Sequence, residues 1–171
     1  MTAKFDYRQI EEFRRKFDHL TLKAYPFPNR IPKAPSKTPV EFIFDTGAMI
    51  TMIDLGTAKK LNYISLPVKR TVTLGGIVPG YSIVVDYKVI AGIEIAGLRL
   101  SKVTVAIPSL SDPNAENFER SILGQNVLEY FNYFMDTGNG LIYFKKNPNP
   151  KPISDDAKCG IVFLSDEAFP D

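Results

Sequence analysis

The stretch that decides the fold reads Val40-Glu41-Phe42-Ile43-Phe44-Asp45-Thr46-Gly47-Ala48. An apolar strand leads here into an Asp-Thr-Gly turn, although strands that bury their side chains normally exclude Asp. A carboxylate at the inner end of such a strand is either hydrogen-bonded for structure or kept for chemistry. Thr46 can hydrogen-bond locally, and Gly47 allows a second backbone to approach closely. Asp45 is therefore the first candidate for a functional carboxylate.

Length and composition fit one domain with extensions at its ends. The chain has 171 residues, of which 44% are hydrophobic and 23% charged, as is typical of soluble globular proteins. Its net charge of +2 is too small to predict nucleic-acid binding. No apolar run approaches the roughly 20 residues that span a bilayer, and the first residues lack the apolar core of a secretory signal. We expect a cytoplasmic protein with no nucleic-acid and no membrane partner.

Two residues that occur once restrict the chemistry. The lone Cys159 excludes an intrachain disulfide and cannot form a metal site alone. The lone His19 argues against zinc hydrolases and against nucleophilic triads with a histidine base. We therefore expect neither a metal nor another cofactor.

Hydrophobic periodicity and turn residues predict a mostly β protein with short helices. Apolar residues at helical spacing in residues 4–18 predict an N-terminal amphipathic helix. Many short strands favour a closed or rolled β-barrel. The other expected elements are a strand at Leu20–Tyr25, a proline-rich loop over 26–39, a helix over 54–62 capped by Asp54, a glycine-tipped hairpin over 68–85, strands at Tyr87–Ile95 and Leu98–Ile107, a polar loop over 108–120, a helix from Gly124 to Phe131, a hairpin of Phe131–Met135 with Leu141–Phe144, and a strand at Ile161–Leu164.

Three elements, in order, resemble the retropepsin-like aspartic proteases. Asp45-Thr46-Gly47-Ala48 resembles their catalytic turn, Gly75-Gly76-Ile77-Val78-Pro79-Gly80 their glycine-rich flap, and Ile122-Leu123-Gly124 the element packed beneath the turn. The resemblance implies one lobe per chain, built as a closed barrel over residues 38–146. Residues 1–37 would then form an N-terminal extension, with a helix and a proline-rich loop, and residues 147–171 a C-terminal extension.

The resemblance also implies roles for individual residues. The catalytic residues would be Asp45, Thr46 and Gly47, and Thr46 would lock two such turns together across a dimer. A flap closes over substrate and excludes water. Substrate contacts would come from Ala48, Gly75, Gly76, Ile77, Val78 and Gly80, and support of the turn from Ile122, Leu123 and Gly124. The pattern of apolar residues, apart from the resemblance, predicts pockets for apolar side chains near the cleaved bond, lined by Ile50, Ile53, Ile77, Val78, Val105 and Ile107.

Two positions depart from the retroviral pattern. Retroviral members often carry an Asp shortly after the catalytic turn and an Arg directly after the apolar-apolar-Gly element. Met49 and Gln125 stand at these positions here, which is closer to the cellular and bacterial members. Both partners of that ion pair are absent together, so we expect the dimer contact to be built differently.

Peptide hydrolysis by this chemistry needs two carboxylates that share a proton. A second Asp-Thr-Gly occurs at Asp136-Thr137-Gly138, but Asn139-Gly140 and a strand follow it, a pattern typical of a hairpin turn. Too few residues remain after it for a second flap and a second apolar-apolar-Gly element. We therefore expect Asp136 to be structural. The second carboxylate would come from another copy of the chain in a homodimer.

Together these inferences predict an aspartic endopeptidase that acts on extended polypeptides through a water activated by two Asp45 residues. An alternative is a non-catalytic module of the same fold that binds peptides or dimerises. A weaker alternative is a two-lobed single chain that uses Asp45 and Asp136.

Overall fold

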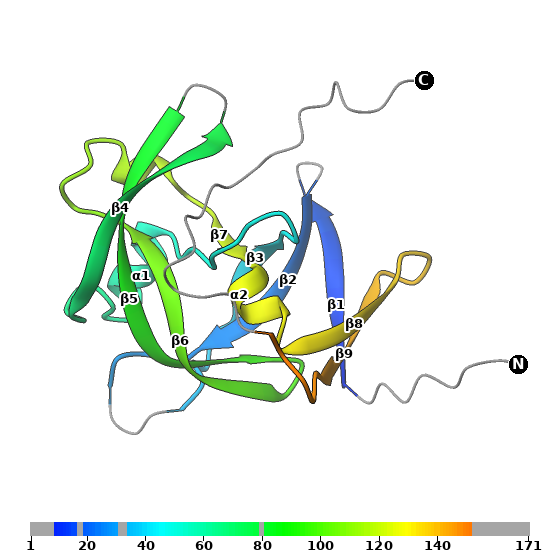
Figure 1. Ribbon diagram of the computed structural model, residues 1–171. Helices are drawn as coiled ribbons and strands as arrows, with labels where there is room; N and C mark the ends of the chain where they lie inside the picture. Colours follow the sequence, from blue (N-terminus) through cyan, green and yellow to red (C-terminus); the bar gives the residue numbers. More distant parts are fainter. Residues whose placement is uncertain (1–8, 17–18, 31–33, 79–80, 152–171) are drawn as a thin grey trace, which may run out of the picture.

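The strands that the computed structural model describes join into one nine-stranded sheet (Figure 1). The structure describes residues 9–16, 19–30, 34–78 and 81–151. Its elements are β1 (Gln9–Lys16), β2 (His19–Pro26), β3 (Val40–Phe44), α1 (Leu55–Lys60), β4 (Val68–Val78), β5 (Tyr81–Ile95), β6 (Leu98–Pro108), the 3-10 helix η1 (Ala115–Asn117), β7 (Ser121–Leu123), α2 (Gln125–Leu128), β8 (Phe131–Asp136) and β9 (Leu141–Lys146). The main path of hydrogen-bonded strands is β4-β5-β2-β1-β9-β8, while β6 pairs with β5, and β3 pairs with both β2 and β7. None of the described helices is long and apolar enough to cross a membrane.

The expected closed barrel is wrong for the described strands, because their ladders do not return on themselves. The gap lies between β6 and β7, where Met52 makes only single bridges, to Ala106 and to Ile122. The chain enters α1 at Leu55, so the segment around Met52 is too short to form a ladder. The mostly β character with few helices is confirmed.

The expected N-terminal helix is also wrong in its described part. Gln9–Lys16 is strand β1, which pairs antiparallel with β9 over residues 9–12 and with β2 over residues 13–16. Two neighbouring strands satisfy the backbone of this segment, and such tertiary pairing overrides a weak helical spacing of apolar residues. The rest of the expected helix, residues 4–8 and 17–18, and the expected strand at Ile161–Leu164 lie outside the described residues.

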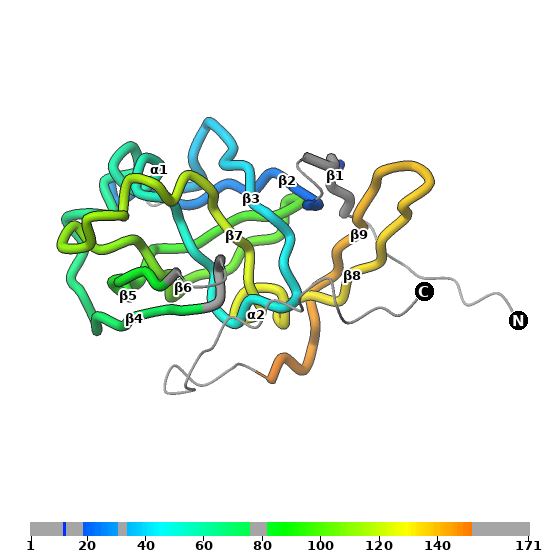
Figure 2. Tube along the Cα trace, turned by 90° about the horizontal axis from the view of Figure 1, so that it is seen from above, coloured from blue at the N-terminus to red at the C-terminus, as the bar shows by residue number. Residues whose placement is uncertain are grey.

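Other local predictions are confirmed. Asp54 caps α1, since its Oδ1 accepts the backbone N–H of Thr57 at 2.8 Å. The β4–β5 and β8–β9 hairpins form, and β5 runs to Ile95 as one strand rather than two. The two hairpins lie on opposite sides of the molecule in both views (Figures 1 and 2).

Buried apolar residues form two clusters, and the smaller one lies beneath the turn that carries Asp45. The larger cluster joins side chains from β2, β3, β5, β6, α1, α2, β8 and β9. The smaller one contains Ala48, Met52, Leu74, Val85 and Ile122, among others. The turn that follows β3 therefore packs on this smaller cluster, which we call the buried platform and to which the β4–β5 hairpin also contributes.

Candidate active site

Strand β3 carries Asp45 to the end of a ladder that is held on both sides. The strand pairs antiparallel with β2 and parallel with β7, and Phe42 and Phe44 are buried. The backbone N–H of Asp45 donates to the carbonyl of Leu123 at 3.2 Å, one residue beyond the last ladder pair. Asp45 is thus the last residue that the sheet holds before the chain turns.

The carboxylate of Asp45 organises the turn through one of its oxygens. Oδ1 accepts the backbone N–H of Gly47 at 2.8 Å and that of Ala48 at 3.2 Å. Asp45 is half-buried, Thr46 and Gly47 are exposed, and Ala48 is fully buried. Within the described part of the chain, no hydrogen bond reaches Oδ2. The turn therefore fixes one carboxylate oxygen and leaves the other for a further group.

The predicted supporting residues lie directly against this turn. Ile122 and Leu123 are buried in β7, and Gly124 follows them. A Cβ atom at Gly124 would lie 2.6 Å from the carbonyl carbon and oxygen of Ile50, and 2.9 Å from the carbonyl oxygen of Ala48. Only glycine fits where two backbones approach this closely, and this is the physical need behind the apolar-apolar-Gly pattern.

Three polar side chains beside the turn were not predicted as site residues. Gln125 donates from Nε2 to the carbonyl of Thr46 at 2.7 Å. Asn126 accepts the N–H of Thr51 at Oδ1, at 2.7 Å, and donates from Nδ2 to the carbonyl of Thr104 at 2.8 Å. The hydroxyl oxygen of Thr51 accepts the N–H of Gly124 at 3.0 Å. The available signal was the pair of amides that directly follows Gly124.

Near the tip of the glycine-rich hairpin, Gly75 is the glycine whose surroundings are described, and it does not pack against the turn. Gly75 pairs with Ser82, and a Cβ atom added at Gly75 would meet nothing within 4 Å. The backbone of Gly76, Ile77 and Val78 belongs to β4, whereas Gly80 lies outside the described residues.

The loop after β6 is fastened to one arm of this hairpin. Asp112 is buried, and its carboxylate accepts the N–H of Val84 at 2.6 Å and that of Asn114 at 2.8 Å. These two hydrogen bonds, that of Val84 first, lower the pKa of Asp112. The N–H of Ser109 also donates to the carbonyl of Val84 at 2.8 Å. These bonds therefore hold the β5 arm of the hairpin at Val84, which pairs with Thr73 two pairs before Gly75 and Ser82.

The expected apolar subsites are wrong at four positions. Ile53, Val105 and Ile107 are at most 1% exposed and belong to the larger core cluster, and Ile50 belongs to the smaller one. These four side chains pack among the protein's own buried residues, which leaves them no open surface for a substrate. The side chains of Ile77 and Val78 lie outside the described residues.

Asp136 lies in a different setting, as predicted. It ends β8 and pairs with Leu141 at the start of β9, so it belongs to a hairpin turn. Its carboxylate accepts the N–H of Asn139 at 3.1 Å and the Nδ2–H of the same residue at 2.8 Å. Those bonds, the side-chain bond first, lower the pKa of Asp136.

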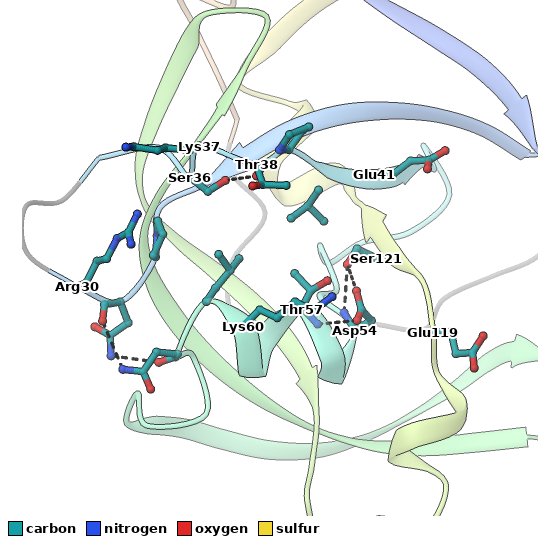
Figure 3. A pocket seen from close by; sticks show the side chains of 16 residues that line it. Arg30, Ser36, Lys37, Thr38, Glu41, Asp54, Thr57, Lys60, Glu119 and Ser121 are labelled. Carbon is teal, nitrogen blue, oxygen red and sulfur yellow. Dashed lines mark hydrogen bonds between the residues drawn. The ribbon is translucent and has the colours of Figure 1, made fainter.

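A surface pocket of about 840 Å³ lies at the other end of β3 (Figure 3). Val40 and Glu41, which begin that strand, line the pocket, whereas Asp45 follows the strand's far end. Two polar side chains in it already bond each other, since the hydroxyl of Ser121 donates to Asp54 at 2.8 Å. The pocket is therefore separate from the turn that carries Asp45.

Comparison with known proteins agrees with this geometry. Residues 34–127, more than half of the chain, match the family model described as aspartyl protease. The structure is similar to the crystal structure of a retropepsin-like aspartic protease from Rickettsia conorii, with a TM-score of 0.54 and 20% sequence identity. That similarity covers 80% of this chain and 89% of the other. No match is found among curated proteins.

Proposed function

Because the chain belongs to the aspartyl protease family and has a retropepsin-like fold, we propose that it is an aspartic endopeptidase. Its substrates are extended polypeptides, and its nucleophile is a water activated by two Asp45 carboxylates. Each carboxylate comes from one chain of a homodimer.

The observation that carries this proposal is the way the turn presents Asp45. Oδ1 is held by the N–H groups of Gly47 and Ala48, and the carboxylate remains half-buried on a turn whose outer residues are exposed. The structural Asp136, by contrast, has both carboxylate oxygens bonded within its own turn, Oδ1 by the backbone N–H and Oδ2 by the side-chain amide of Asn139. Asp45 is fixed at Oδ1 and has no hydrogen bond at Oδ2 within the described part of the chain.

The second carboxylate in the proposed dyad is the same residue of a second chain. A two-fold axis beside the exposed Thr46 and Gly47 would bring two Asp45 side chains together in identical surroundings. Two carboxylates at that range cannot both ionise cheaply, so they share one proton. The ionised member takes a proton from water, and the protonated member polarises the peptide carbonyl and then protonates the leaving amine.

The β4–β5 hairpin is the proposed flap. Its arms are paired from Val68 with Lys88 to Val78 with Tyr81, and Asp112 holds the β5 arm at Val84. A paired hairpin of this kind can cover a bound peptide and hydrogen-bond to its backbone. In this proposal, Gly75, Gly76, Ile77, Val78 and Gly80 contact the substrate together with Ala48.

The proposal is tested by cleavage of a mixed peptide library by the wild type, Asp45→Asn and Asp136→Asn. The first variant removes the general base and should lose roughly a thousandfold or more in rate, while the second should cleave like the wild type. Equal cleavage by Asp45→Asn and wild type would contradict the proposal. A peptide-binding module without catalysis would instead bind library peptides in all three proteins and cleave none.

A further inference from the structure

One side chain outside the expected site residues contacts the turn itself. Gln125 is the first residue of α2 and is only partly buried. Its Nε2 donates to the carbonyl of Thr46 at 2.7 Å. The acceptor decides the orientation of the amide, because only the NH₂ end of a glutamine can donate to a carbonyl.

The backbone of the same residue holds the other side of the turn. The N–H of Gln125 donates to the carbonyl of Ala48 at 2.7 Å. Gln125 therefore donates hydrogen bonds to both carbonyls that flank Gly47, to that of Thr46 from its side chain and to that of Ala48 from its main chain. On the other side of Thr46, the N–H of Asp45 is bonded to Leu123. The Thr46 peptide is thus held between Asp45 and Ala48, whose backbone groups are both hydrogen-bonded.

The chemistry of this contact differs from the ion pair that retroviral members often place here. Met49 cannot accept an ionic hydrogen bond from a residue at position 125, so a cation there would lack that partner. A neutral amide donates to a backbone carbonyl without needing a counter-charge. The contact between residue 125 and the turn is therefore made within one chain and between uncharged groups.

We propose that Gln125 is a positioning residue, which holds the Thr46 peptide so that Thr46 and Asp45 have their working orientation before the second chain arrives. This inference rests on the proposed function. Gln125 touches neither substrate nor the reacting atoms, so it acts only through the turn. A positioning contact lowers the barrier by keeping reacting groups aligned, and its loss reduces kcat more than it changes KM.

Two variants separate the hydrogen bond from the shape of the side chain. Gln125→Met keeps an unbranched chain of similar length and removes the donor. Gln125→Glu keeps the shape and donates only while its carboxyl group is protonated, with an ordinary pKa of about 4.3. Asn149→Asp introduces the same charge at an exposed position outside α2 and the turn, and serves as the matched control.

The measurement is kcat and KM from pH 3.5 to pH 7.5, on a fluorogenic peptide taken from the library screen and cleaved by the wild type. Gln125→Met should lose roughly three- to tenfold in kcat at every pH, the size expected for one neutral hydrogen bond, with KM little changed. Gln125→Glu should show its deficit near neutral pH and approach the wild type as pH falls through about 4.3. Asn149→Asp should follow the wild type throughout.

The outcomes also separate this inference from the proposed function. Wild-type kcat in Gln125→Met, or a deficit in Gln125→Glu that does not change with pH, would overturn the positioning role while Asp45-dependent cleavage stands. Because Gln125→Glu is compared with the wild type at each pH value, a folding defect that does not depend on pH cannot imitate the expected recovery. Absence of Asp45-dependent cleavage in the wild type would remove the proposed function and this inference with it.

Discussion

Asp45-Thr46-Gly47 and Asp136-Thr137-Gly138 are the same tripeptide in two regions of one molecule. In both, the aspartate accepts hydrogen bonds from residues two or three positions ahead, as Asp does in tight turns. The first turn rests on a buried platform and is bonded to Leu123 and Gln125, far along the chain. The second turn connects the neighbouring strands β8 and β9, and the carboxylate of Asp136 is bonded by Asn139 within the same turn.

The difference shows that contacts from distant residues, and not the tripeptide itself, distinguish the two Asp-Thr-Gly turns. Local turn chemistry is common to both copies, so it cannot distinguish a catalytic turn from a hairpin. The distinguishing contacts come from residues 122–126, which pack and bond against one copy alone. Substitutions of matched residues around the two turns therefore test whether residues 122–126 make the difference.

The largest effect on stability is expected from Gly124→Ala. The added methyl group would meet backbone atoms of Ile50 at 2.6 Å, and rigid backbone cannot move aside cheaply. We expect a loss of about 3 kcal/mol in the free energy of unfolding, at the upper end for overpacking. The measurement is urea denaturation followed by circular dichroism.

Gly138→Ala is the matched control in the second turn. A Cβ atom there would lie 3.5 Å from Oδ1 of Asp136, an ordinary contact, so the change should stay within about 0.5 kcal/mol. Similar losses in the two variants would mean that residues 122–126 do not distinguish the turns.

A smaller effect is expected from Asn126→Ala. The substitution leaves the N–H of Thr51 and the carbonyl of Thr104 without their partner, which costs about 2 kcal/mol for partly buried groups. Asn139→Ala removes an amide that bonds Asp136 in an exposed turn, and it should cost much less. Chemical denaturation of both variants gives the comparison, and a greater loss in Asn139→Ala would contradict it.

The smallest effect concerns pH and the second turn. Asn139 holds the pKa of Asp136 below its ordinary value of about 3.9, so the carboxylate stabilises the folded state above that pH. This contribution is lost as pH falls through the lowered folded-state pKa. Asp136→Asn should therefore be slightly less stable than the wild type near pH 7 and equal to it in strong acid. A difference that grows on acidification would show that the bonds to Asn139 do not favour the ionised form.

Sequence patterns predicted the parts of this protein that depend on local chemistry or on a strong motif. The resemblance to retropepsin-like aspartic proteases is confirmed, as are the Asp54 cap, the two hairpins and the hairpin setting of Asp136. The cap and the hairpins rest on residues that lie close together in sequence, and the resemblance rests on three motifs in a fixed order. The roles of Asp45, Thr46 and the flap residues stay predictions, since structure alone does not test catalysis.

The failures arose where distant partners decide the outcome. Gln9–Lys16 is a strand because β2 and β9 satisfy its backbone, and the spacing of its apolar residues carries no trace of those neighbours. The barrel stays open because Met52 makes only single bridges before α1 begins. Gln125 and Asn126 were passed over as site residues, since their partners lie 79 and 75 residues away.

The central claim, that one site needs an Asp45 from each of two chains, is tested most directly by mixing wild type with Asp45→Asn. The two proteins are unfolded together at equal amounts, refolded, and assayed on a cleaved peptide at constant total protein. If both carboxylates are required, only dimers of two wild-type chains cleave, and activity falls to about one quarter of that of wild type alone. Activity of about one half would mean that each chain works by itself and would contradict the shared dyad.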